Sequence, residues 1–535
     1  MHLGLHSVHR SICAALVWTC VLVGLPSTGR ATLYDWTDGY YRLRLNIPDS
    51  VETVRGIVIW GNGGGGNNVN YATNAELVAL AESIDFAVLG TGYWFNFSDP
   101  GGLEIAYFEE QIAAFATNSG HAELTNAPYL PMGHSNGGQM SYGFAILRPE
   151  KVIAFATSKG TYYVTNRPSE AALRIPGLLI AGVDDEVASR VANRGLFETN
   201  RPRGALWAWV EEPYTGHSDN YAANLKMAFF AECYRLRYPS DQSPTNGPVR
   251  LNDLNEFDGW LVGVGTNNWY QPLPPIYRYD DAPGDKRAYG WVPNERIARI
   301  YQTLAARDKY SATVTGSIGV TNGPTNLFYS TDLKDAKWTK VEFYQGAEKI
   351  GEVASNGFDR VEITPLAESG GLYVFHAVVT SNNIQSPTYL RRVFVNAPAR
   401  LTPFQQWAET NLPSGTRGPK DVLHAEDGIA NLTRFVFNLG TNANPSRDAL
   451  PQFAGFTNTG GVQRALFQYR VGTAQRESGV NVRPGMSTNM LNWSPVRSPV
   501  FASDRAAFWR EGDTNKVLLP ASSKGFLRML LDDCF

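Results

Sequence analysis

The feature that most constrains the fold is a glycine-bracketed turn between a strand and a helix. Gly133-His134-Ser135-Asn136-Gly137 follows an apolar run with strand character and opens directly into a stretch of helical periodicity at 137–147. Small residues two positions before and two positions after Ser135 allow the strand and the helix to approach each other at a sharp turn. The chain therefore contains a strand that enters a helix without an intervening loop, which predicts an α/β unit.

The sequence around this turn repeats the alternation of strand and helix from Thr32 to about Lys309. Strand-like runs occur at 56–60, 86–90, 129–133, 152–156, 177–181 and 206–211, and helical patterns at 74–83, 103–116 and 137–147. This alternation predicts a mainly parallel sheet with helices on both faces. From about residue 240, Pro, Gly, Asp and aromatic residues replace the pattern until a helical stretch at 294–306. We expect a long extension there, wrapped over the α/β domain.

The rest of the chain changes character. Short alternating strands at 341–345, 349–353, 372–379 and 391–395 are separated by Gly, Asn and Ser and predict a β-sandwich over 311–398. The string Val341-Glu342-Phe343-Tyr344-Gln345-Gly346 resembles the immunoglobulin-like modules of secreted bacterial enzymes. Residues 400–535 carry helical patterns at 404–410 and 428–437 and then a β-rich segment. A length of 535 residues agrees with several domains.

The N-terminus predicts export. A segment with His and Arg ends at Arg10, and an apolar run from Ile12 to Leu25 and small residues up to Ala31 follow it. This is the layout of a signal peptide over 1–31, so we expect a secreted protein, extracellular or periplasmic, without membrane contact after cleavage. The alternative is an uncleaved membrane anchor. Cleavage leaves Cys233 and Cys534, which can form a disulfide or remain two free thiols.

The charge pattern argues against nucleic acid as a partner. The formal net charge is -3, and no basic stripe interleaved with aromatic residues is found. A calcium site is not expected either. Glu426-Asp427-Gly428 resembles the end of an acidic calcium loop, but Leu423 and Ala425 stand where oxygen ligands are needed. We therefore expect no metal and no other cofactor.

A second glycine-rich segment, residues 61–66, directly follows the predicted strand at 56–60. Such a loop can hold phosphate, but here it lacks the Lys-Ser/Thr ending of a P-loop. The turn at Ser135 has the layout of a nucleophile elbow, which predicts that Ser135 is a nucleophile; the alternative is an ordinary turn before a helix. The glycine-rich segment can then present a backbone N–H to the oxyanion that forms when Ser135 attacks a carbonyl. The amide of Asn136, the residue after the nucleophile, would be the second donor. Gly63 is the expected donor in the loop, with Asn62 and Gly64 as alternatives.

The general base is found by elimination among three histidines of the α/β domain. His134 lies inside the turn, and His121 precedes the nucleophile strand, whereas His217 follows the last predicted strand. Only His217 occupies the position of the base in a chain order of serine, acid, histidine. Asp185, after the strand at 177–181, is the expected orienting acid. Asp184 remains an alternative, because one of two neighbouring aspartates can be a helix cap.

This ordered set resembles the α/β-hydrolase superfamily over about residues 33–239. The layout is similar to secreted esterases and depolymerases of the polyhydroxybutyrate depolymerase, feruloyl esterase and acetyl xylan esterase kinds. The resemblance implies a serine hydrolase that cleaves carboxylic esters through an acyl-enzyme, on a small-molecule or polymeric substrate such as a plant polysaccharide. The alternative is an extracellular adhesion or carbohydrate-binding protein in which the hydrolase domain is only a scaffold.

Aromatic residues supply the last hypothesis. Tyr93, Trp94 and Phe95 follow the predicted strand at 86–90, and Trp260, Trp269, Tyr270 and Trp291 lie in the extension. Aromatic faces beside a cleft can hold a sugar or a phenolic ring, so Tyr93 and Trp94 are candidate substrate-binding residues. The competing interpretation is that these rings pack the extension onto the core.

Overall fold

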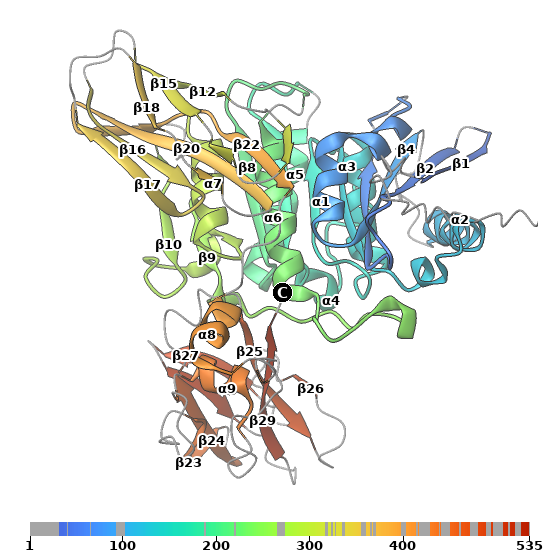
Figure 1. Cartoon of the computed structure of the whole chain (residues 1–535). Coiled ribbons are helices and arrows are strands. Elements are labelled where there is room, and N and C mark those ends of the chain that lie inside the picture. The colour runs from blue at the N-terminus through green and yellow to red at the C-terminus, as the bar shows by residue number, and fades with distance from the viewer. Residues whose placement is uncertain are drawn as a thin grey trace, which may run out of the picture.

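The structure is a computed structural model of the chain (Figure 1). It describes residues 32–39, 41–61, 63–64, 66–92, 102–186, 189–218, 221–264, 273–315, 319–322, 325–326, 328–333, 338–354, 360–363, 366–367, 371–396, 403–413, 416, 429–437, 439, 450–459, 462–470, 480–487, 494–495, 507–511, 514–518 and 526–533. Several residues named in the sequence analysis lie outside these ranges. They are the predicted signal peptide, Asn62, Tyr93, Trp94, Phe95, Trp269, Tyr270, the acidic segment around Asp427, and Cys534.

An eight-stranded sheet forms the centre of the N-terminal part. Its strands are β1 (Thr32–Asp38), β2 (Tyr41–Ile47), β3 (Gly56–Gly61), β4 (Phe86–Gly92), β5 (Tyr129–His134), β6 (Phe155–Ser158), β7 (Gly177–Gly182) and β8 (Trp207–Glu212). They lie in the order β1-β2-β4-β3-β5-β6-β7-β8. The β1–β2 and β2–β4 pairs are antiparallel, and every other pair is parallel. The prediction of a mainly parallel sheet is confirmed.

Helices cover both faces of this sheet because its strands are apolar on both sides. The helices are α1 (Ala75–Glu82), α2 (Leu103–Ser119), α3 (Asn136–Leu147), α4 (Glu170–Leu173), α5 (Ser189–Asn200), α6 (Ala222–Arg237) and α7 (Glu295–Ala305). In β3, Val58 and Trp60 join the core under α1, α6 and α7, whereas Ile57 and Ile59 join the core under α2, α3 and α5. The period of two along the strand thus supplies two separate cores.

One predicted strand is shifted. The sequence pattern places a strand at 152–156, but β6 begins at Phe155. Val152 makes only an isolated bridge to Tyr129. The reason is that the buried Arg237 of α6 donates to the carbonyl oxygens of both Val152 and Ile153, each at 2.6 Å. These carbonyls therefore bind a guanidinium instead of backbone N–H groups of a neighbouring strand.

The extension packs onto the α/β domain through buried polar contacts. It contains a small sheet of β9 (Trp260–Val262), β10 (Ile276–Arg278) and β11 (Gly290–Val292). Trp291 is buried, and its indole N–H donates to the carbonyl of Glu256 at 2.8 Å. The fully buried Arg201 binds the Glu256 carboxylate at 2.6 Å. These contacts favour the packing interpretation for Trp291.

Two β-rich parts follow (Figure 1). The first contains the strands β12 (Ser311–Thr315), β13 (Gly319–Asn322), β14 (Thr325–Asn326), β15 (Phe328–Asp332), β16 (Trp338–Gln345), β17 (Glu348–Ala354), β18 (Arg360–Ile363), β19 (Leu366–Ala367), β20 (Gly371–Ser381), β21 (Ile384–Pro387) and β22 (Arg391–Asn396). Its pairs are antiparallel except for β13 with β22, and Tyr329, Phe343 and Phe375 share one core. The structure thus places antiparallel sheets here, and the immunoglobulin-like assignment stays a prediction.

The last part contains α8 (Pro403–Asn411), α9 (Asn431–Val436), β23 (Gln452–Thr459), β24 (Val462–Arg470), β25 (Val480–Ser487), β26 (Ser494–Pro495), β27 (Ala507–Glu511), β28 (Thr514–Leu518) and β29 (Phe526–Asp533). Phe257 of the extension joins its core.

The first β-rich part shares a hydrophobic core with the α/β domain. Val374, Leu390 and Phe394 pack in the same cluster as the inner faces of α1, α6 and α7. Arg392 adds an ion pair with Glu76 of α1. The α/β domain is therefore covered on this side by the β-rich part rather than by water.

Two further findings concern the described residues. Cys233 is a free thiol buried in the α/β core, and burial raises its pKa. In the part of the chain that the structure describes, no helix is long and apolar enough to cross a membrane.

Candidate active site

The predicted site residues meet at one edge of the parallel sheet. The glycine loop follows β3, Ser135 follows β5, Asp185 follows β7 and His217 follows β8, so all four lie beyond carboxyl ends of strands. The chain passes from β3 to β4 on one side and then to β5 on the other side of β3. The switch point of the sheet therefore lies between β3 and β5. Open α/β sheets bind ligands at this place.

Ser135 occupies a strained turn between β5 and α3. Its φ of 55° and ψ of -119° are rare for a residue with a side chain. The turn is held by the Ser135 N–H, which donates to the carbonyl of Ser158 at 2.8 Å. A Cβ at Gly133 would lie 2.4 Å from the backbone of Gly137, and one at Gly61 would lie 2.6 Å from the same residue. Glycine at these positions is therefore a steric requirement of the turn.

The glycine loop lies beside this serine. A Cβ at Gly63 would lie 3.8 Å from Cβ of Ser135, and one at Gly64 would lie 3.3 Å from Nδ2 of Asn136. Asn136 is the first residue of α3, where backbone amides have no acceptor within the helix and the helix dipole is positive. The structure thus brings the glycine loop close to both Ser135 and Asn136.

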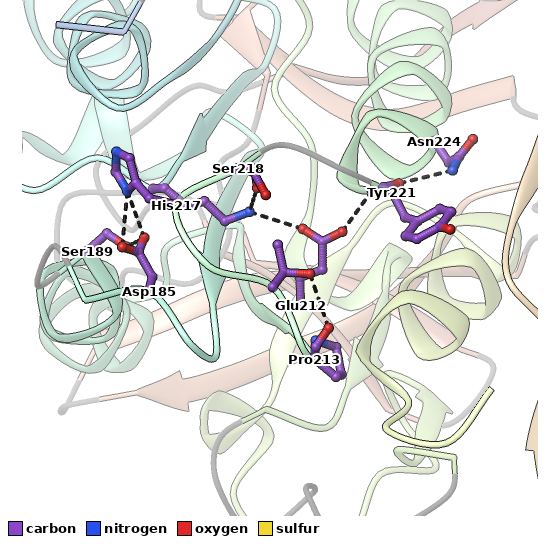
Figure 2. Close-up of polar contacts among 10 residues, drawn as sticks. Asp185, Ser189, Glu212, Pro213, His217, Ser218, Tyr221 and Asn224 are labelled. Carbon is purple, nitrogen blue, oxygen red and sulfur yellow. Dashed lines mark hydrogen bonds and ion pairs between the residues drawn. The ribbon is translucent and has the colours of Figure 1, made fainter.

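A buried carboxylate, Asp185, pairs with the partly exposed imidazole of His217. Nδ1 of His217 lies 3.0 Å from each carboxylate oxygen of Asp185, and Ser189 donates a further hydrogen bond to Oδ2. The Asp185 side chain is 0% exposed and the His217 side chain 26% exposed. Figure 2 shows both carboxylate oxygens facing the imidazole. The neighbouring Asp184 is exposed, so Asp185 is the aspartate whose carboxylate contacts His217, and its role as the orienting acid stays a prediction.

The position of His134 connects this pair to the serine. The rings of His134 and His217 lie 4.7 Å apart between centroids, at an interplanar angle of 59°. Because His134 directly precedes Ser135, this contact brings the His217 imidazole beside the turn that carries the serine. His121, excluded on chain order, instead contacts Glu123 at 2.8 Å near the opposite end of β5.

The sequence did not indicate a buried ion pair beside the His217 loop. Lys159 follows β6 with a φ of 56°, and its Nζ lies 3.1 Å from Oε2 of Glu212. It also donates to the carbonyl of Ser218. The only signal in the sequence is that β8, a fully buried strand, ends in two glutamates.

Two predictions remain, the aromatic substrate-binding residues and the absence of a metal. Tyr93 and Trp94 lie outside the described residues, so their substrate-binding role stays a prediction. Among the residues that the structure describes, no three His, Cys, Asp or Glu side chains gather closely enough to hold a metal ion.

Comparisons with known proteins give partial structural likeness only. No known family model matches the chain, and no curated protein matches it in sequence. Among solved structures, poly(aspartic acid) hydrolase-1 from Sphingomonas sp. KT-1 is 17% identical, with a TM-score of 0.28 over 38% of this chain and 96% of that one. An acetyl xylan esterase from Aspergillus awamori is 14% identical, with a TM-score of 0.30 over 37% and 99%. A mutant feruloyl esterase module from Clostridium thermocellum, complexed with sinapinate, is 12% identical, with a TM-score of 0.28 over 39% and 87%. The function of this chain is therefore inferred from its own residues.

Proposed function

We propose that the chain is a serine hydrolase that cleaves carboxylic esters through an acyl-enzyme. The observation that carries this proposal is the pair of the buried Asp185 carboxylate with His217, whose imidazole packs against the residue before the strained Ser135. A strained serine and a buried carboxylate both cost stability, so a domain that served only as a scaffold would have no reason to combine them.

The mechanism follows from the hydrogen bonds of His217. Its Nδ1–H donates to Asp185, which leaves a lone pair on Nε2 to take the proton of the Ser135 hydroxyl during attack on the ester carbonyl. The amides of Gly63 and Asn136 stabilise the negative charge on the former carbonyl oxygen. His217 then protonates the leaving alcohol, and water, activated by the same imidazole, releases the acid. These steps require no cofactor.

The substrate and the location are proposed from the sequence. The signal-like N-terminus supports export, and the resemblance to secreted esterases supports an ester of a polysaccharide or a polyester. The immunoglobulin-like character of residues 311–398 belongs to the same proposal.

The test is hydrolysis of short-chain p-nitrophenyl esters by the mature chain and by Ser135→Ala and His217→Ala, with folding checked by circular dichroism. Activity in the parent and near-abolition in both variants are expected. Activity that survives Ser135→Ala would disprove the nucleophile. A folded parent that neither hydrolyses esters nor reacts with a fluorophosphonate would favour a binding protein instead.

A further inference from the structure

His217 lies between β8 and α6, in a loop of which residues 213–218 and 221 are described. The two ends of this loop are tied together, because Oε1 of Glu212 accepts the backbone N–H of Tyr221 at 2.8 Å. Its middle is tied down by Lys159, whose Nζ donates to the carbonyl of Ser218, the residue after the base. Oε2 of the same Glu212 pairs with Lys159 at 3.1 Å. Figure 2 shows Glu212 between Ser218 and Tyr221, on the side of the loop away from Asp185.

We propose that the buried Lys159–Glu212 pair is a positioning device for the catalytic base. This role of the pair rests on the function proposed above. Neither residue touches the reacting atoms; the pair fixes the main chain beside His217, so that the imidazole keeps its contacts with Asp185 and with the His134 ring next to Ser135.

The burial of the pair supports this role. The Lys159 side chain is 0% exposed and that of Glu212 is 2% exposed. A buried ion pair is weak evidence for stability, since desolvation of the two charges can exceed their attraction. The two hydrogen bonds between the pair and the loop, from Lys159 to the Ser218 carbonyl and from the Tyr221 N–H to Glu212, explain why the pair is retained here. Lys159 also holds the left-handed backbone conformation that non-glycine residues rarely adopt, with its N–H bound to the carbonyl of Ile180 at 2.7 Å.

Close packing joins this pair to the Asp185 side of the site. A Cβ at Gly182 would lie 2.3 Å from the carbonyl oxygen of Thr215 and 3.1 Å from Cε of Lys159. The amide of Asp184 donates to the same Thr215 carbonyl at 3.0 Å. The end of β7, the Lys159 side chain and the His217 loop are thus in direct contact. A displacement of the loop would separate His217 from Asp185, and misplacement by about 1 Å can cost a catalytic group about 100-fold in rate.

The experiment compares Lys159→Met with the parent, and both with the same change in a His217→Ala background. We expect kcat for a p-nitrophenyl ester to fall about 100-fold with KM within about twofold, and fluorophosphonate labelling of Ser135 to slow by a similar factor. In the His217→Ala background the substitution should change the residual rate less than about twofold, because a positioning residue acts only through the base. An equal loss in both backgrounds would overturn the proposal, since a general loss of folded structure acts without the base.

A second variant covers the case in which an unpaired Glu212 prevents folding. Lys159→Met with Glu212→Gln removes both charges, keeps an acceptor for the Tyr221 N–H and still removes the donor to Ser218. Its kcat should also fall about 100-fold. The matched control is Arg201→Met with Glu256→Gln, a buried pair outside the loop, whose kcat per folded molecule should stay within about twofold.

The outcomes separate this proposal from the proposed function. A parent that neither hydrolyses esters nor reacts with the fluorophosphonate overturns both. A parent that is labelled, together with Lys159 variants that are labelled at the parental rate, overturns the positioning role alone.

Discussion

Replacing Asp185 by Asn tests the central contact of the site. The substitution keeps the size of the side chain and removes its charge. The carboxylate lies 3.0 Å from Nδ1 of His217 with no exposure to water. With the charge centres about 4 Å apart and an effective dielectric constant of about 20, the imidazolium formed during catalysis would lose about 4 kcal/mol of stabilisation. That loss corresponds to about a thousandfold in kcat. An amide N–H facing Nδ1 would also favour the wrong tautomer, which adds to the loss.

The assay is kcat for a p-nitrophenyl ester, with Asp184→Asn as the matched control. Asp184 is exposed and contributes only its backbone amide to the loop, so its variant should retain kcat within about twofold. If Asp184→Asn lost activity and Asp185→Asn kept it, the assignment of the orienting acid would be refuted. Equal and small effects in both variants would show that no carboxylate orients the base.

Three other perturbations have calculable outcomes. Gly133→Ala should destabilise the fold by about 3 kcal/mol in urea unfolding, because its Cβ would meet the Gly137 backbone at 2.4 Å; an unchanged midpoint would refute the steric requirement. Burial, aided by Arg299, lowers the pKa of His376 to about 3 from 6.5, so the folded state disfavours its protonation. Its stability contribution is complete above pH 6.5 and should fall by about 3 kcal/mol at pH 4; His376→Phe, which keeps a ring on Tyr344, should remove this part of the pH dependence of Tm. A chain ended after residue 309 should melt about 10 °C or more below the full chain, because it exposes the core under α1, α6 and α7; equal melting temperatures would show that the shared core adds no stability.

The parts of the site that could be predicted depend on local patterns. Ser135 is marked by glycines at fixed spacing, and His217 by its place after a buried strand. The choice between Asp184 and Asp185 could not be made in this way, because both follow the same strand and only the turn directs one side chain inward. Contacts between distant segments leave no such pattern. Lys159 meets a glutamate 53 positions away, and neither residue stands in a recognisable motif.

The fold divides in the same way. The parallel strands follow from apolar runs, and five of six were placed nearly correctly. Both antiparallel strands of the central sheet, β1 and β2, were missed. The strand β1 is largely exposed, and β2 alternates arginine with leucine, so neither sequence carries a continuous apolar signal. The core shared with β20 and β22 was also missed. The alternation in those strands predicts that one face is buried, but it does not indicate which part of the chain packs against that face.

That shared core has a consequence for how the chain reaches its native state. A chain that emerges N-terminus first releases α7, which ends at Ala305, well before Phe394 becomes available to cover it. Roughly 90 residues separate the two, so one face of the α/β domain stays uncovered during that interval. Completion of the domain is thus coupled to synthesis of the β-rich part. A chaperone would have to shield this face until that part is available.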